Sequence, residues 1–210
     1  MAELAINGGA PVRTAPFPQW PQGGEAEMEQ LEKVLKAQQW GTLGDQALTF
    51  AKKFAAYIGV EHGICVNNGT ISLELILRGL NIGYGDEVIV PAYTFISTGS
   101  AVAIAGATPV FADIESCTYN IDPASIEANI TSKTRAIIAV HIGGRPCNMD
   151  KIMEIAKKHG LYVIEDCAQA HGSQWRDRKV GSIGHAASFS FQQSKNLTSG
   201  EGGAILTDDF

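Results

Sequence analysis

The spacing of apolar residues predicts two helices followed by a series of strands. Apolar side chains recur at helical spacing from Met28 to Leu35 within residues 25–39, and again within residues 46–57. Beyond them, short apolar runs alternate with helix-like segments or turns. These runs cover residues 63–66, 87–91, 109–112, 136–141, 161–165, 187–191 and 203–207. Such a β/α rhythm predicts an α/β fold with an open, mostly parallel sheet of seven strands.

Turn residues mark the limits of several of these elements. Gly85-Asp86 introduces a strand that Pro91 ends, and Asp122-Pro123 starts a helix. The last strand, 203–207, follows a connection that is too short for a crossover helix. We therefore expect this strand to run antiparallel to its neighbours.

The composition indicates a globular protein with an extended N-terminal arm. The chain has 210 residues, of which 45% are hydrophobic, so it can bury one large core. Residues 1–24 are rich in glycine and proline, which favours an extended arm over a folded unit. The expected organisation is an arm over 1–24 and one large domain over 25–210.

Charge and hydropathy argue against several classes of partner. The formal net charge is -6 and there is no long run of lysine or arginine, so we expect neither a nucleic acid nor a membrane partner. The N-terminus lacks the features of a secretion signal, which predicts a cytoplasmic protein. The four cysteines have no metal-ligand spacing, so we expect no metal, and we interpret all four as buried or semi-buried thiols.

Two strand ends carry residues suited to an anion and to an aromatic ring. Asn68-Gly69-Thr70 lies between a strand and an apolar-striped helix, where free backbone N–H groups can hold a phosphate. Alternatively, Asn68 or Thr70 only caps that helix. At the next strand end, Phe95 can stack on a heteroaromatic ring, although an isolated phenylalanine is more often plain core.

Two later strand ends carry a carboxylate and an amine. Asp166 follows an apolar strand, and a buried carboxylate there needs a cationic partner such as a pyridinium nitrogen. The alternatives are that Asp166 caps a helix or binds an arginine. Ser190 and Lys195 follow within about 30 residues. Ser190 offers a hydroxyl that can bind a phosphate, and Lys195 offers an amine that can form a Schiff base. Taken alone, a lysine after a strand is usually a solvated surface residue.

Three stretches, in this order and spacing, resemble the DegT/DnrJ/EryC1/StrS sugar aminotransferases, a family of fold-type I pyridoxal phosphate enzymes. They are Gly85 to Phe95, Glu165 to Gly172, and Ser188 to Lys195 with Gly200-Glu201-Gly202-Gly203. The resemblance covers nearly the whole chain. It implies a three-layer sandwich, the large domain of the aspartate aminotransferase type. Family members continue into a smaller C-terminal domain, which we expect to be missing from this chain.

The resemblance also implies a role for each candidate residue. Lys195 would be the Schiff-base lysine and proton shuttle, and Asp166 the partner of the pyridine nitrogen. The remaining cofactor-binding residues that it implies are Gly69, Thr70 and Ser190 for the phosphate, Phe95 for the ring face, Gln169 for the phenolic oxygen and His171 as a support near Asp166. Relatives that remove a hydroxyl group carry histidine at the lysine position, so Lys195 favours amino transfer.

The function that the resemblance implies is amino transfer with pyridoxal 5'-phosphate as cofactor. The donor would be glutamate or glutamine, and the acceptor a keto sugar, a sugar nucleotide or a cyclitol. A homodimer with active sites at the interface is also implied. Two alternatives stay open: a truncated, non-catalytic cofactor-binding or interaction module, and a related pyridoxal phosphate-dependent dehydratase or lyase.

Overall fold

A mostly parallel sheet forms the centre of the protein. The computed structural model describes residues 3–209. The seven strands of the sheet are β1 (His62–Val66), β2 (Glu87–Pro91), β3 (Thr108–Ala112), β4 (Thr134–Val140), β5 (Tyr162–Asp166), β8 (Ala186–Ser190) and β9 (Gly203–Thr207). Their order is β1-β9-β8-β5-β4-β2-β3. β9 is antiparallel to both β1 and β8, as its short connection predicted, and the other pairs are parallel.

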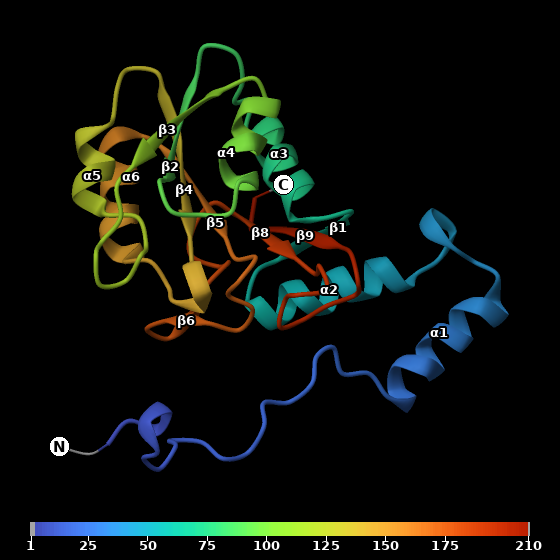
Figure 1. Ribbon diagram of the computed structural model, residues 1–210. Coiled ribbons are helices and arrows are strands. Elements are labelled where there is room, and N and C mark those ends of the chain that lie inside the picture. Colours follow the sequence, from blue (N-terminus) through green and yellow to red (C-terminus); the bar gives the residue numbers. More distant parts are fainter. Residues whose placement is uncertain (1–2, 210) are drawn as a thin grey trace. The chain divides into compact units, whose positions relative to one another are not determined.

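Helices cover both faces of this sheet, which gives three layers (Figure 1). They are α2 (Gln46–Ile58), α3 (Gly69–Gly79), α4 (Ser97–Ile104), α5 (Pro123–Ala128) and α6 (Met149–His159). In Figure 1, α3 and α4 lie on one side of the sheet, and α5 and α6 lie on the other. The predicted fold class is therefore confirmed.

The core follows the alternation of side chains along the central strands. Val88 and Ile164 belong to the cluster that packs under α3 and α4, whereas Ile89 and Val163 face α5 and α6. A third cluster joins Phe54 of α2 to the last strands. Because successive residues of a strand point to opposite faces, Glu165 shares the face of Val163 and Asp166 shares the face of Ile164. This alternation decides the surroundings of the two carboxylates at the end of β5.

Some short elements and one cysteine differ from the sequence prediction. A hairpin of β6 (Gln174–Trp175) and β7 (Arg178–Lys179) was not predicted, because two-residue strands are too short to show a periodic pattern. The short 3₁₀ turns η2 (Gly41–Leu43) and η3 (Ile142–Gly144) were not predicted either. Cys147 and Cys167 are buried and Cys65 is half-buried, but Cys117 is exposed. It lies in the surface turn between the bridged residues Ile114 and Ile121, so the prediction for this thiol was wrong.

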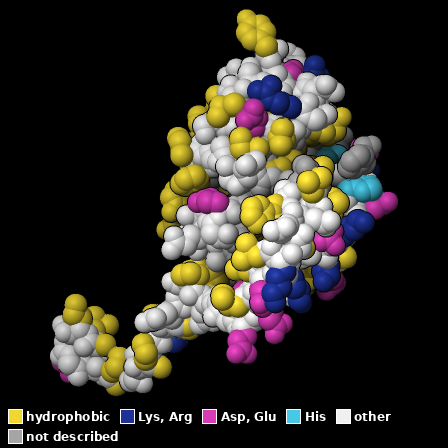
Figure 2. Space-filling model, turned by 90° about the vertical axis from the view of Figure 1, so that its right-hand side faces the viewer, with side chains coloured by type: hydrophobic (Ala, Val, Ile, Leu, Met, Phe, Trp, Pro, Cys, Tyr) yellow, Lys and Arg dark blue, Asp and Glu magenta, His cyan; other side chains and the backbone are white. Residues whose placement is uncertain are grey.

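The surface has a mixed character. Hydrophobic side chains are interspersed with acidic and basic ones over the face shown in Figure 2. Several large hydrophobic side chains are well exposed, including Phe95 and Ile96 just after β2 and Phe111 on β3. No helix among residues 3–209 is long and apolar enough to cross a membrane.

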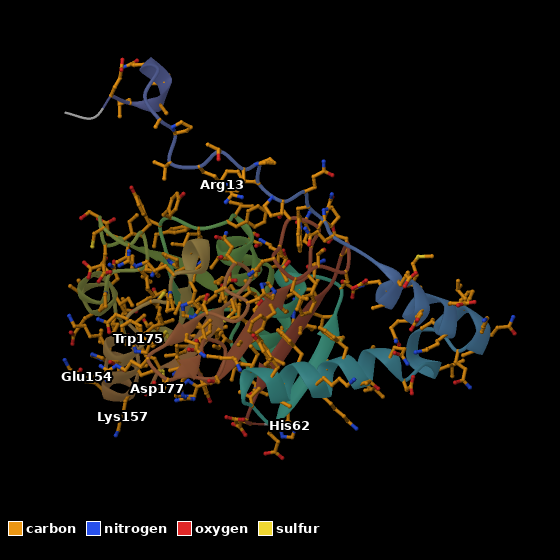
Figure 3. All side chains as sticks on the ribbon, turned by 90° about the horizontal axis from the view of Figure 1, so that it is seen from below. Arg13, His62, Glu154, Lys157, Trp175 and Asp177 are labelled. Atoms are coloured by element: carbon orange, nitrogen blue, oxygen red, sulfur yellow. The ribbon has the colours of Figure 1, made fainter. Side chains whose placement is uncertain are left out.

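The first 38 residues form a unit separate from the sheet domain, which begins at Gln39. This unit contains the short turn η1 (Ala5–Asn7) and α1 (Glu25–Ala37), the first of the predicted helices. Between them, Arg13 donates hydrogen bonds to the carbonyl oxygens of Ala15 and Pro16, and its guanidinium lies 4.4 Å from the centre of the Phe17 ring (Figure 3). That residues 1–24 act as an arm stays a prediction.

Candidate functional site

A cavity of about 520 Å³ lies at the carboxyl ends of the parallel strands. Open α/β sheets bind their ligands at this edge, where the loops after the strands meet. Seven of the eight predicted cofactor-binding residues line the cavity: Gly69, Thr70, Phe95, Asp166, Gln169, Ser190 and Lys195. The structure therefore brings together strand ends that are more than 100 residues apart in the sequence.

The first turn of α3 forms one end of the cavity. Asn68 caps this helix, because its side-chain oxygen accepts the N–H of Ile71 at 2.9 Å. The capping alternative therefore holds for Asn68, and it is compatible with the phosphate interpretation. A Cβ atom at Gly69 would lie 3.0 Å from Cβ of Ser190 and would enter the space between them. Glycine at this position keeps the N–H groups at the start of α3 accessible to an anion.

Hydroxyl groups join α3 to β8 beside this turn. Ser188 donates a hydrogen bond to the carbonyl oxygen of Gly69 at 3.2 Å, and it also bonds to Ser72. Two residues further along the strand, Ser190 lines the cavity and is 7% exposed. Its Oγ accepts only a long hydrogen bond of 3.4 Å, from the N–H of Gln192. The Ser190 hydroxyl proton is therefore available to a ligand oxygen, and that this ligand is a phosphate stays a prediction.

Asp166 also lines the cavity and is nearly buried, with 6% exposure. Burial raises the pKa of its carboxyl group, although hydrogen bonds and the positive charge of Lys195 act to lower it. One carboxylate oxygen accepts the N–H of Ala168 at 3.2 Å, and the other accepts the hydroxyl of Thr98 at 3.1 Å. A carboxylate held in this way is ready to bind a cationic nitrogen.

Gln169 and Phe95 line the same cavity. The side-chain oxygen of Gln169 accepts the N–H of Gly143 at 2.7 Å, so its amide N–H groups are the ones left for a ligand. Phe95 is 65% exposed and lines the cavity, so the alternative that it belongs to the core is wrong. Its ring is available for stacking on a flat ligand.

Lys195 lies in the loop between β8 and β9 and is half-buried at the cavity. Its N–H donates to the carbonyl oxygen of Gln192 at 2.9 Å, which closes a tight turn before the lysine. The following residue, Asn196, has its side-chain oxygen 2.9 Å from Nδ1 of His171. This contact ties the lysine loop to the loop that follows Asp166.

His171 is the one predicted residue that the structure places away from the cavity. Its ring packs against Phe189 and Phe191, with centroid distances of 5.5 and 5.7 Å, and it lines a separate hollow beside α2. Burial lowers the pKa of this imidazole. Direct contact between His171 and a ligand in the cavity therefore finds no support in this arrangement.

Glu165, next to Asp166, has a different role. It accepts backbone N–H groups of Gly181, Ile183 and Gly184 at 2.7–2.9 Å, and it lies 3.0 Å from Nε2 of His141. The N–H of Cys147 donates to Nδ1 of that imidazole, so Nε2 carries the proton and donates it to Glu165. Although burial opposes ionisation, these hydrogen bonds hold the pKa of Glu165 below its ordinary value.

Sequence reasoning missed Thr94 and Thr98. Thr94 lines the cavity, and its hydroxyl oxygen lies 2.8 Å from that of the fully buried Thr98, which contacts Asp166. The available signal was two threonines four residues apart between a strand end and a helix. Thr98 lies in the first turn of α4, whereas Thr94 lies in the connection that leads from β2 into this helix.

Sequence comparison finds relatives over almost all of the chain. The model of the DegT/DnrJ/EryC1/StrS aminotransferase family matches residues 21–210. The L-glutamine:2-deoxy-scyllo-inosose aminotransferase of Streptomyces paromomycinus is 45% identical over 212 residues, which cover 98% of this chain and 50% of that protein. The chain thus spans about half the length of the curated relatives it matches.

Structure comparison finds the same fold in solved proteins. The aminotransferase from Psychrobacter cryohalolentis superimposes with a TM-score of 0.89 at 47% identity, over 92% of this chain and 50% of that one. The protein Spr1654 of Streptococcus pneumoniae, in its PLP-form, gives a TM-score of 0.87 at 34% identity, over 94% and 54% of the two chains. As its motifs predicted, the chain belongs to the DegT/DnrJ/EryC1/StrS aminotransferase family.

Proposed function

We propose that this chain is the cofactor-binding part of a pyridoxal 5'-phosphate-dependent aminotransferase. The observation that carries the proposal is one cavity lined by an amine, a buried carboxylate and an anion cradle, namely Lys195, Asp166 and the Gly69–Ser190 pair. The donor is glutamate or glutamine, and the acceptor is a keto sugar, a sugar nucleotide or a cyclitol. The glutamine and cyclitol in the name of the Streptomyces paromomycinus relative support this choice.

The residues present fit pyridoxal phosphate at both ends of the molecule. A Cβ at Gly69 would lie 3.0 Å from Cβ of Ser190, so glycine lets the start of α3 and the Ser190 hydroxyl lie close enough to bind one phosphate together. At the other end, a buried carboxylate is costly unless a cation neutralises it, and a protonated ring nitrogen is such a cation. Phe95 would cover a ring face, and the amide N–H of Gln169 would donate to the phenolic oxygen.

When bound, pyridoxal phosphate supplies an electron sink that stabilises negative charge at the carbon next to the amino group. Lys195 contributes a primary amine that can hold the aldehyde covalently and can afterwards carry a proton at Nζ. Asp166 would keep a proton on the ring nitrogen through its ionised carboxylate. Ser190 and the first turn of α3 would hold the phosphate and so would fix the orientation of the reacting carbon.

The assignment of Lys195 is tested by chemical trapping in the complete gene product. After borohydride reduction and peptide mapping, we expect the cofactor mass on Lys195 and nowhere else. Lys195→Ala should lose the cofactor attachment and lower amino transfer by about 10²- to 10⁴-fold or more. Lys157→Ala, a change at an exposed lysine of α6 labelled in Figure 3, is the matched control. Cofactor mass on another lysine would contradict the proposal.

The same preparation distinguishes the two alternatives. A non-catalytic module would stay colourless when cofactor is added, because no coloured lysine adduct forms. A dehydratase or lyase would bind the cofactor but would release water or another small product without accepting an amino group from glutamine. Amino transfer from labelled glutamine to the product contradicts both alternatives.

We also propose that the active protein is a homodimer located in the cytoplasm. Support for the dimer comes from apolar side chains near the mouth of the cavity, because Phe95, Ile96 and Tyr93 are all more than half exposed. Exposed apolar patches beside a site commonly mark an interface. Sedimentation of the complete protein measures its mass in solution, and cell fractionation measures its location.

A further inference from the structure

Two threonine hydroxyls connect the cavity to Asp166. Thr98, in the first turn of α4, is fully buried, and its hydroxyl lies 3.1 Å from a carboxylate oxygen of Asp166 on β5. Thr94 lines the cavity, and its hydroxyl lies 2.8 Å from that of Thr98. A hydroxyl has one proton and an ionised carboxylate has none. Thr98 therefore donates its hydroxyl proton to Asp166, and Thr94 donates its own to the hydroxyl oxygen of Thr98.

The carboxylate of Asp166 depends on few donors for its charge and orientation. Its two oxygens are held separately, one by the N–H of Ala168 at 3.2 Å and the other by Thr98. The side chain is 6% exposed, so water contributes little. A hydrogen bond to a buried charged group stabilises that charge more than a bond between neutral groups does. Losing one of two such bonds therefore changes the ionisation of Asp166 strongly.

We propose that Thr98 is a positioning residue for Asp166: its hydroxyl keeps the carboxylate ionised and turned into the cavity, and Thr94 orients Thr98 in turn. This inference rests on the proposed function, in which Asp166 binds the cofactor ring nitrogen. Thr98 does not line the cavity, so it would act on a bound cofactor only through its hydrogen bond to Asp166. Its influence should therefore appear in cofactor binding and in kcat, with little effect on the KM of the amino donor.

The titratable groups around Asp166 allow a pH test. His141, Lys195 and Cys167 all interact electrostatically with its carboxylate, and Glu165 precedes it on the strand. None of these groups is changed when Thr98 is replaced. Burial already raises the pKa of Asp166, and the Thr98 hydroxyl opposes that rise. Without the hydroxyl, Asp166 takes up a proton at a higher pH than in the wild type. The variant should therefore lose its affinity for the protonated ring at a higher pH as well.

Three variants of the complete gene product separate the hydroxyl from the packing of the side chain. Thr98→Val keeps the shape and removes the donor, whereas Thr98→Ser keeps the donor and removes a methyl group. Thr118→Val is the matched control, because Thr118 also donates to a carboxylate, that of Glu115 at 2.6 Å, but does not line the cavity. The measurements are the Kd for pyridoxal phosphate, the pH titration of its visible absorption band, and kcat and KM.

For Thr98→Val we expect cofactor affinity to fall about 10- to 100-fold, which is the usual effect of losing a hydrogen bond to a charged group. The pH at which the bound cofactor is released should rise, and kcat should fall while KM changes little. Thr98→Ser should restore most of the affinity, and Thr118→Val should behave like the wild type.

Three results would overturn the inference in distinguishable ways. Unchanged affinity and pH titration in Thr98→Val would show that the hydroxyl does not act on Asp166. Equal losses in Thr98→Val and Thr98→Ser would assign Thr98 to packing alone. A wild-type protein that binds no pyridoxal phosphate would overturn the proposed function, and this inference with it.

Discussion

Adjacent carboxylates at the end of β5 show how strand geometry assigns different tasks to similar residues. Glu165 and Asp166 point to opposite faces of the sheet. Glu165 is saturated by three backbone N–H groups and His141, and its pKa is lowered. Asp166 has two donors and faces the cavity, and burial raises its pKa. Glu165 is therefore satisfied by groups of the fold itself, whereas Asp166 lines the cavity, where we propose that it binds a ligand.

We expect Glu165→Ala to destabilise the protein by about 3–5 kcal/mol, because it leaves buried N–H groups and His141 without an acceptor. Glu165→Gln should cost less, since it keeps one acceptor oxygen. Thermal denaturation measures both. Glu154→Gln, at an exposed position of α6, is the control and should stay within about 0.5 kcal/mol of the wild type. Equal stability of Glu165→Ala and the wild type would contradict the anchoring role.

The pH dependence of Glu165 has a defined sign. Its pKa in the folded protein lies below the unfolded reference value of 4.5, so the unfolded chain binds the proton more readily. The stabilisation is fully present above pH 4.5 and is lost as the pH falls through the lower folded pKa. The Glu165→Gln variant has no such group to titrate. Its stability should therefore fall less steeply than that of the wild type between pH 4.5 and acid denaturation.

At the level of elements, the junction of α3 and β9 requires backbone atoms to approach closely. A Cβ at Gly203 would lie 2.5 Å from the carbonyl carbon of Asn68 and 3.0 Å from the nitrogen of Gly69. Both atoms belong to the turn that starts α3, for which we propose phosphate binding. Glycine is therefore needed at position 203 because two backbone segments pack closely there. The spacing of the family motif did not show this reason.

We expect Gly203→Ala to displace this turn, to destabilise the protein by about 1–3 kcal/mol, and to weaken cofactor binding. The matched control is Gly79→Ala at the end of α3, where an added Cβ meets no atom within 4 Å. Alanine favours helix there, so the control should be as stable as the wild type or gain up to about 1 kcal/mol. Calorimetry and a cofactor titration check both variants, and equal behaviour of the two would contradict the close approach.

On the scale of the whole molecule, the cavity opens beside a group of exposed apolar side chains. Ile96 is 77% exposed directly after Phe95, and it precedes α4. If a second copy covers this surface, Ile96→Asp should weaken self-association of the complete protein without unfolding it, because a charge would be buried in the interface. Tyr84→Asp, at a fully exposed turn residue, is the control for losing an exposed apolar side chain. Sedimentation velocity at several concentrations should show dissociation in the first variant alone.

Much of this molecule could be predicted from local patterns. Apolar periodicity located all seven strands and both N-terminal helices, because strand and helix repeats depend on neighbouring residues only. The ends of those strands carry Gly69, Asp166, Ser190 and Lys195, and parallel strands bring such ends to one edge of the sheet. The family, and the gathering of these residues at one cavity, therefore followed from the spacing of motifs.

Other features depended on which loops the folded chain brings into contact. Thr98 reaches Asp166 across 68 residues, whereas His171 turns from the cavity to Asn196 and two phenylalanine rings. No local sequence pattern predicted the strand order or the exposure of Cys117 either. A hydrogen bond between distant residues leaves no periodic signal along the chain. Its partners are chosen by the crossover connections and by the packing of helices on the sheet, and these exist only in the folded protein.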